Sequence, residues 1–157
     1  MKIKGLTIGE PKPRVTIIER GDVTHVFKLK AVTNTDEFDK ICPLPQPPKS
    51  MKPGGLVTVN YESPEYKEAL TKYYQLKTNW IVLQSISATE ELQWDTVDLN
   101  KPDTWENYIK ELGDAGLTQG EITHLITEIN KANSFDSDRM DEALDRFIRG
   151  QEAPVAG

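Results

Sequence analysis

The chain has few of the residues from which reactive sites are built. Its 157 residues include one cysteine and two histidines, so no internal disulfide bond can form. His25 falls in a predicted strand and His124 on the polar side of a predicted helix, with neither a cysteine nor a second histidine near either of them in the sequence. Zinc sites draw their ligands from such clusters. The sequence therefore predicts no metal and no cofactor.

Other motifs that carry chemistry are missing as well. The segment that begins at Asp136 starts like a calcium loop, but Met140 and Asp141 stand where an oxygen ligand and a glycine are required. The "PGG" string lacks the spacing of a phosphate-binding loop, and no serine lies in a nucleophile elbow. Cys42 is a lone cysteine, which is more typical of a small buried side chain than of a nucleophile. We expect no catalytic residue, and predict that the protein is not an enzyme.

Long hydrophobic runs are absent too. No apolar stretch approaches the ~20 residues that cross a bilayer, and "MKIKGLTIGEPKPR" lacks the apolar centre of a secretory signal. With the single cysteine, this indicates a soluble intracellular protein that does not contact a membrane.

The net charge of −6 is unevenly distributed. Residues 1–60 carry ten Lys or Arg against six Asp or Glu, whereas residues 61–157 carry nine against nineteen. The acidic part argues against binding to nucleic acid, which needs clustered basic side chains. It is either a solvated surface or a docking face for a basic partner, and the charge alone leaves both open.

Proline is concentrated in one segment of the chain. The strap "CPLPQPPKSMKPGG", residues 42–55, holds five of its ten prolines. Its first half has polyproline II character, and Pro45 with Pro48 forms a P-x-x-P string of the kind that docks in aromatic grooves. Because such strings are common, we favour a rigid tether. Pro45 and Pro48 remain the candidate partner-binding residues.

The first forty residues predict β-structure. "RVTIIER" and "DVTHVFKLKAV" are rich in β-branched and aromatic residues, and the Arg-Gly-Asp string at residues 20–22 supplies a turn between them, so a β-hairpin is expected. An integrin-ligand role for that string is disfavoured because no secretion signal is present. "TDEFDKIC" predicts a short helix, capped by Asn34 or Thr35 and ended by Pro43. "LVTVNY" is a possible short strand.

From residue 63 onward the sequence predicts helices. The longest, "SPEYKEALTKYYQLKTNWIVLQSI", begins with Ser63 as the N-cap and Pro64 at the first helical position. One face is predicted to form the spine of the core. Its members are Tyr66, Ala69, Leu70, Tyr73, Leu76, Trp80 and Leu83.

Three further helices are marked by their start and stop signals. In "PDTWENYIKELGDAG", the residues Trp105, Ile109 and Leu112 share one face, and Gly113 and Gly116 end the helix. "LTQGEITHLITEINKAN" carries a capping box of Thr118 and Glu121. "DSDRMDEALDRFIRG" has acids first and arginines late. Its predicted inward residues are Met140, Ala143, Leu144, Phe147 and Ile148.

These signals predict an α+β fold. Its parts are a β-rich N-terminal portion with a short helix (residues 1–41), the strap (42–55), a helical portion of about four helices around Trp80 and Trp105 (56–150), and a flexible tail (151–157). Whether the β and helical parts share one core is left open.

The order of these segments resembles a family of small tailed-bacteriophage proteins identified as tail assembly chaperones or as their uncharacterised relatives. The resemblance runs from about residue 14 to 151. It rests on "DEFDKICPLPQPP", the helix that contains Trp80, and the "AGLTQGEI…ANS" ending. The family pattern prefers a basic residue where Gln46 stands, and another at Leu76 or Lys77, so any partner contact through those positions is altered here.

The resemblance implies a non-catalytic factor in virion morphogenesis. Such a chaperone binds the long, aggregation-prone tape measure protein, helps to recruit tail tube subunits, and acts in the host cytoplasm. A homo-oligomer stays open. One alternative is a structural virion component, such as a decoration or tail-associated protein. Another is an inhibitor or adaptor of a host protein.

Overall fold

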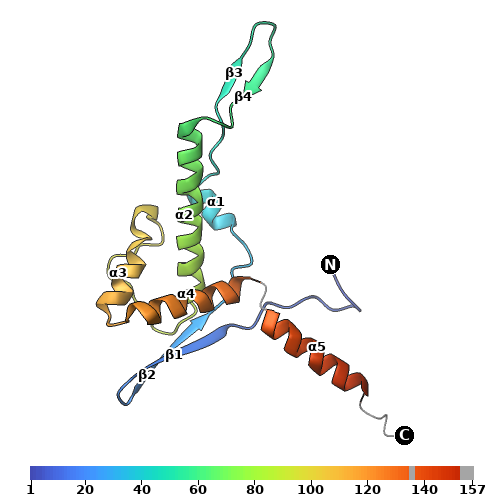
Figure 1. Cartoon of the computed structure of the whole chain (residues 1–157), viewed down its shortest axis with the longest axis vertical. Coiled ribbons are helices and arrows are strands. Elements are labelled where there is room, and N and C mark those ends of the chain that lie inside the picture. The colour runs from blue at the N-terminus through green and yellow to red at the C-terminus, as the bar shows by residue number, and fades with distance from the viewer. Residues whose placement is uncertain (135–136, 153–157) are drawn as a thin grey trace.

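The fold is arranged around one long helix. A computed structural model describes residues 1–134 and 137–152, with the side chains of 141–150 described in the last helix. The long helix is α2, Pro64–Ile86, and most other elements gather around its C-terminal half (Figure 1). The remaining elements, in chain order, are β1 (Arg14–Arg20), β2 (Val23–Leu29), α1 (Asp36–Ile41), β3 (Lys49–Met51), β4 (Val57–Val59), the 3-10 helix η1 (Pro102–Thr104), α3 (Asn107–Asp114), α4 (Gln119–Asn133) and α5 (Ser137–Glu152). The predicted α+β class is confirmed.

The N-terminal hairpin forms as predicted. β1 pairs antiparallel with β2, with Arg20 opposite Val23 across the turn. Gly21 takes a positive φ of 59°, which suits the tight two-residue turn. Ile18, Phe27 and Leu29 are buried, so one face of the hairpin contributes to the core.

The start of α2 is also as predicted, but its burial differs. The Tyr66 amide donates to the Ser63 hydroxyl at 3.4 Å, which confirms the N-cap. Of the predicted apolar face, Ala69 is exposed, and Tyr66, Leu70 and Leu76 are only half-buried. The reason is that the core surrounds only the C-terminal part of the helix. The buried residues of α2 are Tyr73, Trp80, Val82, Leu83, Ser85 and Ile86.

The buried face of α3 is shifted by one residue from the prediction. Ile109 is 45% exposed, and Tyr108 is buried instead. Trp105, Tyr108 and Leu112 keep the i, i+3, i+7 spacing of one helical face, and Ile109 lies at the margin of that face, where the core does not cover it. Tyr108 and Leu112, four residues apart, share the buried side.

The two helix ends that flank the turn between α3 and α4 are both capped. Gly116 has a φ of 100°, and the Leu117 amide donates to the Leu112 carbonyl at 3.1 Å, which closes α3. The predicted capping box starts α4: the Thr118 amide donates to the Glu121 carboxylate at 2.8 Å, and the Glu121 amide donates to the Thr118 hydroxyl at 3.3 Å. The capping-box prediction is confirmed.

The β and helical parts share one core. Phe38 of α1 lies at its centre, with ring centroids 5.8 Å from Trp80 and 6.2 Å from Trp105. The same cluster contains Leu29 from β2 and Leu125 from α4. The question that the sequence left open is answered by this single cluster.

The strap is irregular only in its first half. From Lys49 it forms β3, which turns back at residues 52–56 and pairs with β4. The predicted strand in "LVTVNY" is therefore confirmed, and its partner is a strand within the strap that the sequence pattern does not indicate. We call residues 48–60 the arm, because it projects beyond the N-terminal end of α2 (Figure 1).

The predicted packing of α5 is wrong. Ala143, Leu144, Phe147 and Ile148 are all exposed, and the side chain of Met140 lies outside the described residues. In Figure 1, α5 points away from the other helices. A helical period shows that an apolar face exists but does not show that the same chain covers it.

Candidate protein-binding surfaces

The three residues with potential for chemistry lie apart. Cys42 is buried, and this burial raises the pKa of its thiol, which disfavours the reactive thiolate. His25 is exposed on β2, and the His124 Nε2 lies 3.2 Å from the Thr16 hydroxyl. Across residues 1–134 and the described part of α5, no three His, Cys, Asp or Glu side chains are grouped to hold a metal ion.

A charged clamp fixes β1 on α4. Two Arg14 nitrogens donate to the Glu128 carboxylate at 2.8 and 3.1 Å, and Lys131 donates to the same carboxylate at 3.1 Å. Burial of Glu128 opposes its ionisation, but these hydrogen bonds outweigh burial and lower its pKa. At the other end of β1, Arg20 binds Glu121 at 2.7 Å. The hydrogen bond from Arg20 lowers the pKa of Glu121 to about 2.

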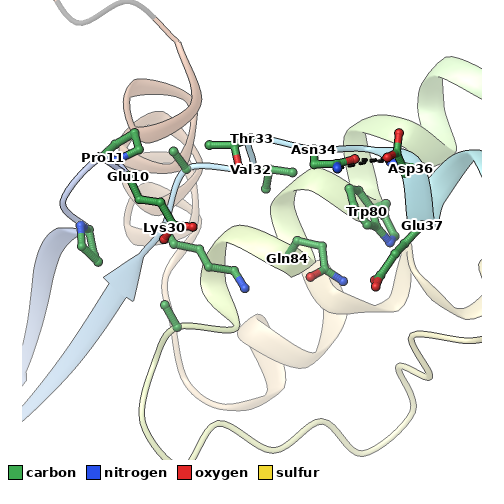
Figure 2. Close-up of a pocket in the computed structure, with 13 residues that line it drawn as sticks. Glu10, Pro11, Lys30, Val32, Thr33, Asn34, Asp36, Glu37, Trp80 and Gln84 are labelled. Atoms are coloured by element: carbon green, nitrogen blue, oxygen red, sulfur yellow. Dashed lines mark hydrogen bonds between the residues drawn. The ribbon is translucent and has the colours of Figure 1, made fainter. Parts of the chain in front are cut away.

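A groove of about 500 Å³ lies between the chain before β1, the segment after β2 and α2 (Figure 2). Its lining mixes acids and one lysine with apolar side chains, and the Asn34 amide donates to Asp36 at 3.1 Å. The residues that line it are Glu10, Pro11, Pro13, Lys30, Ala31, Val32, Thr33, Asn34, Asp36, Glu37, Trp80, Gln84 and Ala88. This set contains no cysteine, histidine or serine.

The arm carries an exposed apolar face. In its register, Met51 lies opposite Val57, and Lys49 opposite Val59, so these four side chains share one face. Met51 is 80% exposed and Val57 55%. A two-stranded hairpin alone in water is marginally stable. Contact with a partner would therefore stabilise the arm and bury its apolar face.

The candidate prolines of the strap lie in its irregular half. Pro45 is half-buried and Pro48 is exposed, so the two are not equally presented to a partner. The exposed Gln46 side chain donates to the Leu44 carbonyl at 3.4 Å, and Leu44 is 49% exposed.

The apolar face of α5 is a further candidate surface for binding a protein. Leu144, Phe147 and Ile148 are 55%, 64% and 43% exposed. Acidic residues precede them on the helix, and Arg146 and Arg149 come among and after them. The sequence pattern indicates these residues but predicts that they face the core, because the helical period is the same for a core helix and for a docking helix.

The chain matches no family model, no curated protein and no solved structure. Its features are those of an α+β protein with apolar surfaces on the arm and on α5. In the described residues, no helix has both the length and the apolar character required to cross a membrane.

Proposed function

We propose that this chain is a non-catalytic assembly factor of a tailed phage, a chaperone that binds the tape measure or tail tube protein through the apolar face of α5. The class of function comes from the sequence resemblance. The observation that carries the binding role is the exposed face of Leu144, Phe147 and Ile148 on a helix of 16 residues.

The expected strength of this contact suits a reversible role. Complete burial of a Leu, Ile or Phe side chain stabilises by about 1.5–3 kcal/mol, and these three are already partly covered. Association also costs rotational and translational freedom. Helix-in-groove contact of this size holds an apolar helix of the partner and still allows release when the tail tube replaces the chaperone.

The charge of the chain fits the same role. Residues 61–157 carry a large acidic excess, with nineteen acids against nine bases. Such a chain keeps a complex in solution while its apolar face covers an aggregation-prone partner. We infer a partner segment that is helical and apolar, with basic residues at its margins.

Co-purification tests this proposal. The full chain, tagged, is co-expressed with each tail protein of the source phage, and the variant Leu144→Ser/Phe147→Ser is compared with Glu142→Ser/Arg149→Ser, which changes the polar side of the same helix. We expect the first variant to weaken binding at least tenfold and the second to bind like the wild type. Equal binding by both variants, or no binding of any tail protein by the wild type, contradicts the proposal.

The arm favours one alternative, a structural virion component that grips its neighbours. Mass spectrometry of purified virions beside the infected lysate separates the two functions. A chaperone that acts in the host cytoplasm is abundant in the lysate and absent from virions. A fixed copy number in virions overturns the chaperone proposal in favour of the structural role.

A further inference from the structure

The two edges of the β1–β2 hairpin differ in how their backbone groups are satisfied. At the β2 edge, the Lys28 amide donates to the Thr89 hydroxyl at 3.0 Å, and that hydroxyl also lies 3.2 Å from the Lys28 carbonyl. Two positions on, the Lys30 amide donates to the Ser85 carbonyl at 3.0 Å. The C-terminal part of α2 and the residues after it therefore cover this edge.

The β1 edge is open. Arg20 and Val23 flank a two-residue turn and form a hydrogen-bonded pair, and such pairs alternate along an antiparallel ladder. The backbone groups of Val15, Ile17 and Glu19 therefore point away from β2. In the described part of the chain, no hydrogen bond reaches the backbone of Val15 or Ile17. β1 has seven residues, with neither proline nor lysine to block pairing.

The open edge borders an exposed apolar face. α4 covers one side of the hairpin, and the opposite side carries Val15, Ile17 and Val26, which are 59%, 51% and 46% exposed. Ile17 and Val26 are directly opposite each other in the ladder. An apolar side chain at an unpaired strand edge favours addition of another strand.

We propose that β1 pairs with β1 of a second copy of this chain, antiparallel, about a two-fold axis at Ile17. This register places Ile17 opposite Ile17 of the second copy, and Val15 opposite Glu19 of the second copy. Every outward backbone group between these residues then has a partner. The result is a four-stranded sheet in the order β2–β1–β1–β2.

Layer geometry favours a second copy over a single added strand. Strands lie about 4.8 Å apart, so the centres of two adjacent hairpins are about 10 Å apart, which is also the spacing of packed helices. Because α4 covers the hairpin of its own copy, the two α4 helices of the dimer then lie side by side. Gly120 and Thr127, on the side of α4 next to His124, are exposed and leave room for that approach.

Charge also fits a second copy. In the proposed register, Arg14 lies opposite Arg20 of the other copy. Each arginine already binds a glutamate of its own α4, Arg14 binding Glu128 and Arg20 binding Glu121. Lys131 binds the same Glu128 carboxylate as Arg14, so each positive side chain at the ends of the new interface has a carboxylate partner within its own copy.

Disulfide trapping tests the register. Ile17→Cys places two thiols at about 5.5 Å between α-carbons across the axis, within the range that a disulfide bridges. Val15→Cys is the matched control, because the register puts the two copies of position 15 about 13 Å apart, at ~3.3 Å per residue. Cys42 is buried and present in both variants.

The wild type is first examined by sedimentation velocity across a range of concentrations, and we expect a dimer. Under mild oxidation we expect Ile17→Cys to form a covalent dimer and Val15→Cys to form little. A wild type that stays monomeric overturns the proposal, as does cross-linking of Val15→Cys that equals that of Ile17→Cys. A monomer that binds an extended segment of another protein at this edge overturns the second copy as its occupant.

A charge at the axis gives an independent measurement. Ile17→Lys brings two ammonium groups together, and we expect the dimer dissociation constant to rise at least tenfold. Val57→Lys on the arm, where Val57 is 55% exposed, is the control and should dimerise like the wild type. Circular dichroism checks that both variants fold. Unchanged dimerisation of Ile17→Lys contradicts the proposal, and the α5 variant Leu144→Ser/Phe147→Ser should dimerise normally, which keeps this test separate from that of the chaperone function.

Discussion

The side-chain hydroxyl of Ser85 donates a hydrogen bond of 2.7 Å to the backbone carbonyl of Lys30. Ser85 is fully buried in α2, and its own carbonyl accepts from the Lys30 amide at 3.0 Å. Asn133, at the end of α4, donates to the same hydroxyl at 3.2 Å and accepts from the Val32 amide at 2.7 Å. This network joins α2, α4 and the segment after β2.

Ser85→Ala should therefore destabilise the fold. The change leaves the Lys30 carbonyl and one Asn133 donor with fewer partners in a partly buried place, which costs about 1–3 kcal/mol. Urea unfolding of the two proteins measures the difference. Ser87→Ala is the control, because Ser87 is exposed and its hydroxyl binds only the Gln84 carbonyl of the same helix. Equal losses in both variants contradict a special role for the network.

The clamp between β1 and α4 should make stability depend on pH. The pKa of Glu121 is about 2 in the folded chain, and that of Glu128 is also lowered. A carboxyl whose pKa is lowered by folding contributes stability above its unfolded pKa of about 4.3, and loses it as the pH falls toward the folded value. The free energy of unfolding should therefore decrease between about pH 5 and pH 2.

Glu121→Gln/Glu128→Gln should flatten that decrease, and Glu128→Gln alone should cost about 1–3 kcal/mol at pH 7 because a charged hydrogen bond is lost. Urea titrations at several pH values measure both effects. Glu68→Gln, at an exposed position of α2, is the control and should retain the wild-type profile. A double variant that keeps the full pH dependence would show that other carboxyls cause it.

Two glycines near the end of α3 should respond in opposite directions to alanine. Gly116 has a φ of 100°, which a side chain disfavours, so Gly116→Ala should destabilise by about 1–2 kcal/mol. Gly113 lies within the helix, and a β-carbon there meets no atom within 4 Å, so Gly113→Ala should stabilise by about 0.5–1 kcal/mol. Thermal unfolding gives both signs. Two shifts of the same sign contradict the geometry of this helix end.

The same substitution in α1 and α5 should separate a core phenylalanine from a surface one. Phe38 is fully buried and Phe147 is 64% exposed. Phe38→Ala should cost about 3–5 kcal/mol, whereas Phe147→Ala should change the free energy of unfolding by less than about 0.5 kcal/mol. Denaturant unfolding measures both. A large loss for Phe147→Ala would show that α5 packs on the core.

Local signals in the sequence predicted several ends of elements correctly, although Gly113, which was predicted to end α3, lies within that helix. The Ser63 cap, the capping box of Thr118 and Glu121, and the turn at Gly21 each depend on residues within three positions of one another. Their hydrogen bonds form wherever the helix or hairpin forms. For this reason they could be predicted without knowledge of the tertiary structure.

What covers each apolar face could not be predicted in the same way. Leu144 and Leu125 have the same helical context in the sequence, but only Leu125 is buried. The pairing of Arg14 with Glu128 and of Ser85 with Lys30 joins segments far apart in the chain, so no local pattern indicates it. The open edge of β1 was missed for the same reason, since it depends on where α2 ends relative to β2.

The strap and arm have a consequence for how the chain can diverge. Between residues 43 and 62 no side chain is buried, whereas Cys42 and Ser63 on either side both are. An insertion or deletion in such a surface segment adds little loop-closure entropy and opens no cavity. This stretch can therefore change length or composition from one protein to the next while the core sequence is held constant, so a new contact specificity can evolve there without loss of the fold.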